Sequence, residues 1–142
     1  MAYYRAYGFP SIITRTANIY GPGQQPFRII PHAIEQKRKG EPVLLHGGGE
    51  DTIRSFIHVK DACEALYLLA KQGVIGDTYH ISTNTAVSIK DLVGMVGART
   101  EVAPERLGKD RAYLLNSDKL RAMGWKDTIH IEEGLKECAS SR

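Results

Sequence analysis

Three polar side chains follow a short apolar run near the amino end of the sequence, and together they could hold a polar ligand. The run over residues 11–14 is rich in β-branched side chains, which predicts a strand. Arg15, Asn18 and Tyr20 come next, before the chain must turn at the Gly-Pro-Gly of residues 21–23. Open α/β sheets place their ligands where loops leave the carboxyl ends of strands, so these side chains are candidate ligand contacts. An ordinary strand followed by a polar turn accounts for the same pattern.

The cysteines and histidines indicate neither metal nor redox chemistry. Cys63 and Cys138 lie far apart without a Cys-x-x-Cys or Cys/His spacing, so we expect reduced thiols. The five histidines are scattered, with no pair at the spacing of a helical metal site. We therefore expect no metal site.

The composition is that of an ordinary globular domain. The chain has 142 residues, of which 42% are hydrophobic and 25% charged, and a chain of this length buries roughly two thirds of its unfolded surface. The net charge is only +3 and the two signs are interspersed, which argues against a nucleic-acid partner. The one basic run, residues 37–39, suits the carboxyl end of a helix. No apolar run approaches the roughly 20 residues of a membrane span, and no signal peptide is evident, so we expect a cytoplasmic protein.

Helices and strands alternate along the chain. Helices are expected over Met1–Tyr7, Phe27–Lys39, the stretch after Asp61, Ser88–Val96, the stretch opened by Ser117, and His130–Cys138. Strands are expected over Ser11–Thr14, Pro42–His46, Thr52–Val59 and Thr78–Ser82, with the second and third paired as a β-hairpin. Ser88 and Asp91 have the spacing of a capping box, and Trp125 is expected in the core.

Five segments stand out along the chain: Thr14–Pro22 (TRTANIYGP), Ile53–Asp61 (IRSFIHVKD), Gly76–Ser82 (GDTYHIS), Arg106–Arg111 (RLGKDR) and Leu120–Trp125 (LRAMGW). In this order they resemble the extended short-chain dehydrogenases that act on nucleotide sugars. This family includes dTDP-glucose 4,6-dehydratases, UDP-glucose 4-epimerases and UDP-glucuronate decarboxylases. The first segment leans slightly towards the dehydratases.

The resemblance implies an α/β fold: an incomplete piece of a Rossmann-type sheet plus the small mixed α/β substrate-binding lobe. Residues 1–142 would form the substrate-binding part, and the amino-terminal NAD-binding domain would be absent from this chain. The resemblance places the family's catalytic Tyr-x-x-x-Lys upstream of Met1, and the family's glycine-rich NAD turn does not occur in the sequence, so no catalytic residue is expected here. NAD is the cofactor implied for the parent enzyme, and we do not expect it to bind this chain alone.

The resemblance also implies the site. The expected substrate-binding residues are Asn18, Arg28, Ile29, His46, Arg54, Asn84, Arg106 and Lys109. Arg54 and Arg106 would hold the diphosphate from two sides, which suits planar guanidinium groups. His46 replaces a family aromatic near the base, and Lys109 replaces an acidic or histidine residue near the ribose. Asn84 either reaches the nucleotide or simply forms a turn.

Two functions stay open. The first is binding of the nucleotide diphosphate of an NDP-sugar, as the carboxyl-terminal part of an NAD-dependent 4,6-dehydratase or epimerase. The second is a non-catalytic remnant or isolated domain that serves as a binding module. In either case strands with unpaired edges favour self-association. The segment over residues 97–104 is shorter than the corresponding segment of the family, which predicts either an abbreviated connection or a malformed lobe.

Overall fold

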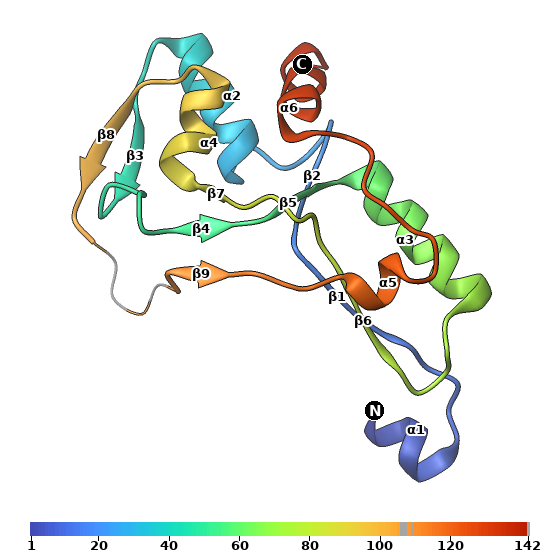
Figure 1. Cartoon of the computed structure of the whole chain (residues 1–142). Coiled ribbons are helices and arrows are strands. Elements are labelled where there is room, and N and C mark those ends of the chain that lie inside the picture. The colour runs from blue at the N-terminus through green and yellow to red at the C-terminus, as the bar shows by residue number, and fades with distance from the viewer. Residues whose placement is uncertain (106–107, 109, 142) are drawn as a thin grey trace.

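The computed structural model describes residues 1–105, 108 and 110–141, in which helices and short strands alternate (Figure 1). The helices are α1 (Ala2–Tyr7), α2 (Ile29–Lys39), α3 (Val59–Gln72), α4 (Ile89–Val96), α5 (Asp118–Arg121) and α6 (Ile131–Ser140). The strands are β1 (Ile13–Thr16), β2 (Asn18–Tyr20), β3 (Val43–His46), β4 (Ile53–Arg54), β5 (Phe56–His58), β6 (Thr78–Ile81), β7 (Val87–Ser88), β8 (Thr100–Ala103) and β9 (Ala112–Tyr113).

The strands pair mostly in parallel, as expected of a Rossmann-type sheet. β1 pairs with β6, β2 with β5 and β3 with β8, all in parallel, while β4 lies between antiparallel β7 and parallel β9. Parallel neighbours need long crossover connections, and α3 lies in the one that leads from β5, the partner of β2, to β6, the partner of β1. The predicted fold class, pieces of a Rossmann-type sheet with a mixed α/β lobe, is confirmed.

One core lies between α3 and the β1–β6 pair. Its buried residues are Ala17, Ile57, Ala62, Ala65, Leu69, Tyr79, Ile81, Leu120 and Trp125. Trp125 is 6% exposed, and its indole Nε1 donates to the carbonyl oxygen of Asp61 at 3.2 Å. The expectation that Trp125 fills the core is therefore confirmed.

Asp61, in the first turn of α3, ties that helix to the segment before α6. The carboxylate is buried and accepts hydrogen bonds from the backbone N–H and hydroxyl of Thr128 and from the N–H of Ile129. The helix is capped instead by His58, whose Nδ1 accepts from the N–H of Lys60 at 3.3 Å. Asp61 therefore has a structural role.

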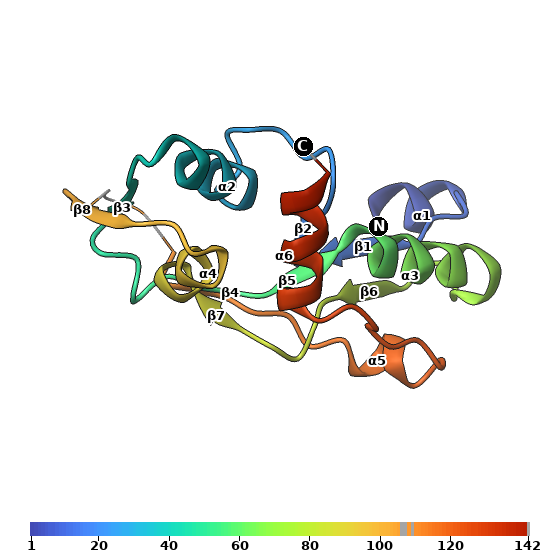
Figure 2. The ribbon, with the colours of Figure 1, turned by 90° about the horizontal axis from the view of Figure 1, so that it is seen from above.

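A second core joins the three helices of the small lobe, with α6 lying between the two halves of the molecule (Figure 2). Apolar side chains of α2, α4, α6 and β3 meet there, among them Ile30, Ile34, Val43, Leu92 and Leu135. The basic run at the end of α2 reaches neighbouring helix ends: Lys37 donates to the Val96 carbonyl and Arg38 to that of Ala139. Cations there suit the negative ends of the helix dipoles.

The expected β-hairpin is wrong. β3 pairs with β8, with His46 opposite Ala103, while the segment after the glycine turn pairs with β2, β7 and β9. Local turn residues favoured a hairpin, but β3 pairs with a strand more than 50 residues along the chain, and its Val43 and Leu45 are buried in one cluster with Ala33 of α2 and Val93 of α4. Residues 97–104 contain β8, which pairs with β3, so the lobe is not malformed there; the abbreviated connection stays a prediction.

The two predicted helix caps have opposite outcomes. Ser88 caps α4, since its hydroxyl oxygen accepts from the N–H of Asp91 at 3.0 Å, and this N-cap is confirmed; the Asp91 carboxylate accepts from the Ser88 hydroxyl at 2.7 Å, in place of the Ser88 N–H that a full capping box would use. Ser117 does not cap α5: its hydroxyl donates to the carbonyl of Ser82, and the side chain of Asn116 accepts from the N–H of Asp118 instead. The Ser117 expectation was wrong because a buried partner competes for the hydroxyl.

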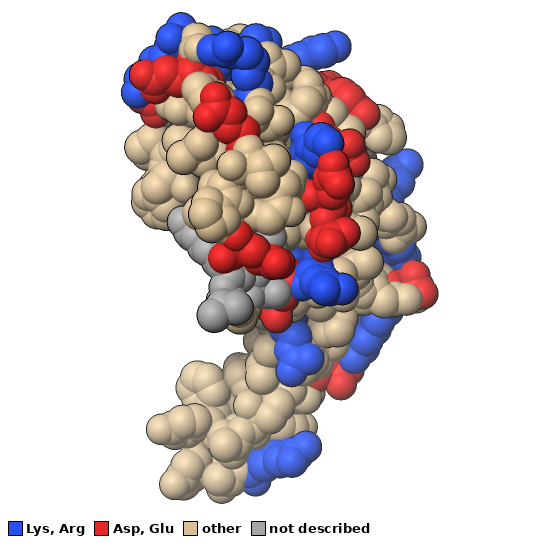
Figure 3. All heavy atoms as spheres, turned by 90° about the vertical axis from the view of Figure 1, so that its left-hand side faces the viewer, with Lys and Arg blue, Asp and Glu red and all other residues tan. Residues whose placement is uncertain are grey.

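The surface carries both signs of charge. On the face shown in Figure 3, basic and acidic side chains lie interspersed over most of the molecule. Among the described residues, no helix is long and apolar enough to cross a membrane, and no group of three or more potential metal-binding side chains gathers.

Candidate functional site

A cavity of about 700 Å³ opens where β2, β4 and β5 meet the start of α2. Its described lining comes from four segments, which supply both apolar and polar side chains: Ala17, Asn18, Ile19, Tyr20, Gln24, Gln25, Phe27, Arg28, Ile29, Ile30, Arg54, Phe56 and Ile89. Four of the predicted site residues, Asn18, Arg28, Ile29 and Arg54, are therefore brought to one cavity by segments far apart in the sequence.

Arg54 is held in place by backbone carbonyls. One guanidinium nitrogen donates to the carbonyl oxygens of Ile53 at 2.7 Å and Arg111 at 3.2 Å, and the other donates to that of Asp110 at 2.8 Å. The side chain is half-buried, and none of these three partners is an anion. The positive charge is thus oriented but not neutralised by these contacts.

Arg28 lies at the N-cap position of α2, on the same cavity. Its backbone is extended (φ −78°, ψ 148°) and its side chain makes no capping hydrogen bond. Ile29 and Ile30 follow as the first residues of the helix and also line the cavity. The first N–H groups of a helix have no partner within it and carry partial positive charge, so this end of α2 favours an anion.

The charged side chains of the described lining are all positive. Among the described lining residues two are arginines and none is acidic. Asn18 adds an exposed amide, which can donate and accept. A cavity with fixed cations, an amide and apolar walls can bind a small organic anion.

Two predicted residues lie outside this lining. The His46 ring, at the end of β3, has Nδ1 2.8 Å from the carbonyl oxygen of Pro104. Asn84 lines a separate space of about 420 Å³ together with Ser55, Thr83 and Asn116. Their roles at a nucleotide stay predictions. Arg106 and Lys109 lie outside the described residues.

Gln24, Gln25 and Phe27 line the cavity but were missed by the sequence reasoning. They belong to the connection between β2 and α2, where no periodic pattern singles out a side chain. The sequence signal that could have found Phe27 is an aromatic residue directly before Arg28 at the start of an expected helix. The side-chain amide of Gln24 donates to the carbonyl of Ile19 at 2.8 Å and so ties this connection to β2.

Tyr20 proves to be a structural residue. It is 2% exposed, and a Cβ built on Gly134 of α6 would lie 2.2 Å from its hydroxyl, so the hydroxyl points into the small lobe. Burial raises the pKa of Tyr20 well above its usual value, which keeps the phenol neutral. The sequence-based suggestion that its hydroxyl holds a ligand is not supported by this orientation.

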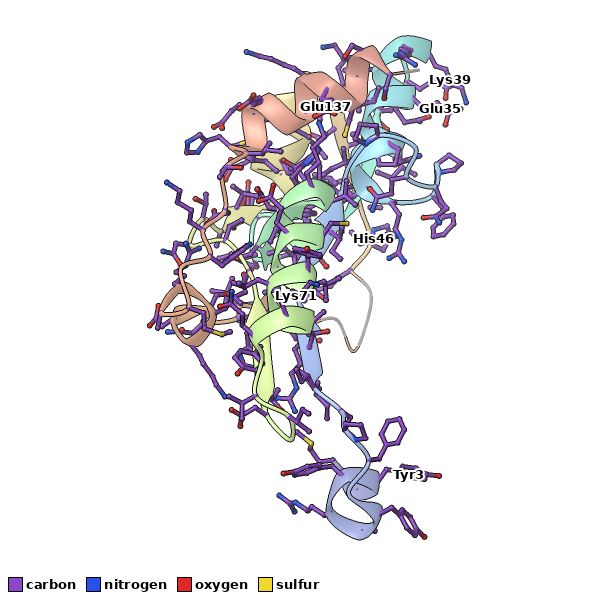
Figure 4. All side chains as sticks on the ribbon, turned by 90° about the vertical axis from the view of Figure 1, so that its right-hand side faces the viewer. Tyr3, Glu35, Lys39, His46, Lys71 and Glu137 are labelled. Carbon is purple, nitrogen blue, oxygen red and sulfur yellow. The ribbon has the colours of Figure 1, made fainter. Side chains whose placement is uncertain are left out.

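A contact between a buried histidine and a carboxylate lies behind Tyr20. The buried His58 ring meets Tyr20 edge-on, with centroids 5.3 Å apart, and its Nε2 lies 3.5 Å from a carboxylate oxygen of Glu137. Burial lowers the pKa of His58, against the opposing attraction of Glu137. The hydrogen bond from Lys60, at 2.8 Å, lowers the pKa of Glu137, which Figure 4 labels on α6.

These features define an α/β protein with parallel strand pieces and, at their junction, a cavity lined by two arginines. The chain belongs to the NAD dependent epimerase/dehydratase family, whose sequence model matches residues 1–82.

Individual relatives agree with this assignment. The chain is 33% identical to the low-salt glycan biosynthesis protein Agl12 of Haloferax volcanii, over 96% of this chain and 46% of the relative. It is 31% identical to the human dTDP-D-glucose 4,6-dehydratase, over 96% of this chain and 42% of that enzyme. The chain therefore spans less than half the length of these relatives.

Solved structures share the fold. The dTDP-glucose 4,6-dehydratase DesIV of Streptomyces venezuelae, solved with NAD bound, superposes with a TM-score of 0.91 at 30% identity, covering 99% of this chain and 46% of that one. A UDP-glucuronic acid 4-epimerase of Bacillus cereus gives a TM-score of 0.90 at 21% identity, over 99% and 47% of the two chains, which shows the fold alone.

The described residues contain no glycine turn of the kind that binds a dinucleotide. The glycine triplet Gly47–Gly49 has positive φ at each position, but it joins β3 to β4 and precedes no helix. A dinucleotide cradle needs a glycine turn that opens a helix, because the helix amino terminus binds the pyrophosphate. No other strand–glycine–helix turn of that spacing occurs in the part of the chain that the structure describes.

Proposed function

We propose that residues 1–142 form the substrate-binding part of an NAD-dependent sugar-nucleotide 4,6-dehydratase or epimerase, and that they bind the diphosphate of an NDP-sugar. The observation that carries this proposal is the shared cavity of Arg28 and Arg54, whose described lining includes no carboxylate. The family membership and the dehydratase relatives support the substrate class.

The diphosphate suits this cavity for a physical reason. Guanidinium groups form short, charge-assisted hydrogen bonds to phosphate oxygens, roughly twice as strong as neutral ones. Arg54 is already oriented by three backbone carbonyls, so little side-chain freedom is lost when the anion arrives. Holding the diphosphate fixes the attached sugar in one place, and such positioning can contribute several kcal/mol to a reaction.

We further propose that Arg106 pairs with the same diphosphate and that Lys109 lies near the ribose. The contact between Arg54 and the carbonyl oxygen of Asp110 supports this, because it brings the segment just after these two residues to the cavity edge. NAD would be held by residues other than those described, and we expect no hydride transfer by this chain alone.

A cytoplasmic location stays a prediction. Neither Cys63 nor Cys138 forms a disulfide in the described part of the chain, as suits a reducing compartment.

Isothermal titration of the chain with UDP-glucose and dTDP-glucose tests the proposal. Arg28→Ala and Arg54→Ala should each weaken binding by about 10- to 150-fold, the loss expected from one charged hydrogen-bonded group. Arg106→Ala should do the same. Arg28→Ala is the cleaner probe, because Arg54→Ala also removes the hydrogen bonds that anchor residues 110 and 111.

Arg5→Ala, on the exposed surface of α1, is the matched control, because it removes one positive charge away from the cavity. It should leave the affinity unchanged. If neither nucleotide sugar gives heat with the unmodified chain, the proposal is wrong, and the alternative of a non-catalytic interaction module takes its place.

A further inference from the structure

Phe27 is a large apolar side chain that stands in solvent at the edge of the cavity. It is 75% exposed, yet it lines the cavity beside its neighbour Arg28. The Arg28 guanidinium carbon lies 5.4 Å from the ring centroid, within the range of a cation–π contact. The cation occupies one face of the ring, and the ring's exposure leaves the other face open to a flat partner.

We propose that Phe27 is the platform on which the base of the bound nucleotide stacks. This inference rests on the proposed function, because it assigns a second part of the same ligand. A nucleotide joins a flat, uncharged ring to a charged diphosphate, and the cavity edge presents an aromatic ring directly beside a guanidinium group. Stacking on an aromatic side chain is tolerant of base identity, because every base has a π-face.

The other aromatic residues of the lining do not offer an open face. Tyr20 and Phe56 are only 2% and 8% exposed, and they pack edge-on against each other with centroids 6.5 Å apart. Among the described lining residues, Phe27 is the one aromatic side chain that a ligand can cover.

The connection that carries Phe27 is held by its own hydrogen bonds. The N–H of Gln24 donates to the carbonyl of Gly21 at 3.3 Å, and the N–H of Arg28 donates to that of Gln25 at 3.1 Å. Gln24 is also tied to β2 through its side-chain amide. A platform on an anchored backbone loses less conformational entropy when a ligand covers it than one on a free loop would.

Titration of Phe27→Ala with UDP and with inorganic pyrophosphate separates the base from the phosphates. Binding of UDP should weaken by about 5- to 150-fold, the loss of one base–aromatic stack, while the affinity for pyrophosphate stays unchanged. Arg54→Ala should weaken both. Phe9→Ala is the matched control, since that ring is also exposed, at 58%, but lies between α1 and β1 outside the cavity lining.

A conservative variant gives an independent signal. Phe27→Trp should keep the affinity for UDP, and stacking of the base should quench the new indole, whereas the native Trp125 is buried in the α3 core. Because Phe27 is exposed, none of these changes removes a core contact.

The outcomes distinguish this inference from the function on which it rests. If the unmodified chain binds UDP and Phe27→Ala binds it equally well, the platform is wrong and the diphosphate site remains. An equal loss for UDP and pyrophosphate would also overturn the platform, because Phe27 would then act by positioning Arg28. If the unmodified chain binds neither ligand, both proposals are wrong.

Discussion

Gly134 of α6 packs directly against the side chain of Tyr20, and we predict from this contact how a substitution at position 134 changes the stability of the protein. A Cβ at position 134 would lie 2.2 Å from the Tyr20 hydroxyl and 2.8 Å from two ring carbons, well inside ordinary van der Waals contact. The ring cannot easily move, because it is 2% exposed and packed edge-on against Phe56 and His58. Gly134→Ala should therefore overpack the lobe.

The expected cost is set by two opposing effects. Replacing a helical glycine by alanine normally stabilises a helix by roughly 0.5–1 kcal/mol. Overpacking of a core typically costs about 1–3 kcal/mol, and the Tyr20 hydroxyl would have to move by about 1.2 Å, from 2.2 Å to 3.4 Å, to reach ordinary contact, so the clash should win. We expect Gly134→Ala to lower the free energy of unfolding by about 1–2 kcal/mol, or on the order of 3–8 °C in Tm.

Gly94 in α4 is the matched control. A Cβ there meets nothing within 4 Å, so Gly94→Ala should show the helix gain alone and raise the free energy of unfolding by about 0.5–1 kcal/mol. The same substitution in two helices should therefore have opposite signs.

A double-mutant cycle identifies the clash partner. The Tyr20 hydroxyl has no hydrogen-bond partner among the described residues, so Tyr20→Phe should be neutral or slightly stabilising. Tyr20→Phe should also recover part of the loss in Gly134→Ala, with a coupling of at least about 0.5 kcal/mol. Chemical denaturation followed by circular dichroism measures all four proteins. Equal effects of Gly134→Ala and Gly94→Ala, or zero coupling, would refute the reasoning.

Three further predictions follow from the packing. Because burial depresses the pKa of His58, the unfolded state takes up a proton near pH 6.5 that the folded state does not. The free energy of unfolding should therefore fall as the pH drops below about 6.5. In chemical denaturation measured at a series of pH values, His58→Gln should flatten this fall. The lowered pKa of Glu137 acts in the same direction only below about pH 4.5, where its contact with Lys60 is lost. Asp61→Ala leaves three donors of Thr128 and Ile129 without an acceptor, so it should lower the free energy of unfolding by on the order of 3 kcal/mol. The exposed Asp118→Ala is the control and should have a small effect in the same thermal or chemical denaturation. Self-association is expected through the open edges of β1 and β6 and the uncovered α1, on which Figure 4 labels Tyr3; a monomer over a wide concentration range in size-exclusion chromatography would contradict it.

Local sequence signals determined most of the elements. Gly8 and Gly40 end α1 and α2 in the left-handed conformation, as glycine at a helix end predicts. The Ser88–Asp91 spacing starts α4, and the apolar spacing of Ile131, Leu135 and Cys138 places one face of α6 in the core. These features depend on residues a few positions apart, so the chain specifies them without knowledge of its distant parts.

The candidate site could be predicted only in part. The resemblance to a family selected Asn18, Arg28, Ile29 and Arg54, and these four do line one cavity. It offered no reason to select Phe27, which depends on how the connection after β2 lies against the start of α2.

The sequence by itself predicted the helices, the strands β1, β3 and β6 to within about two residues, and the family that the chain resembles; it did not predict β2, β7, β8 or β9. The tertiary structure alone decided which strands pair, which way Tyr20 points and which cations share a cavity. The physical reason is that parallel pairing and side-chain burial are set by partners tens of residues away, such as β8 for β3 and α6 for Tyr20.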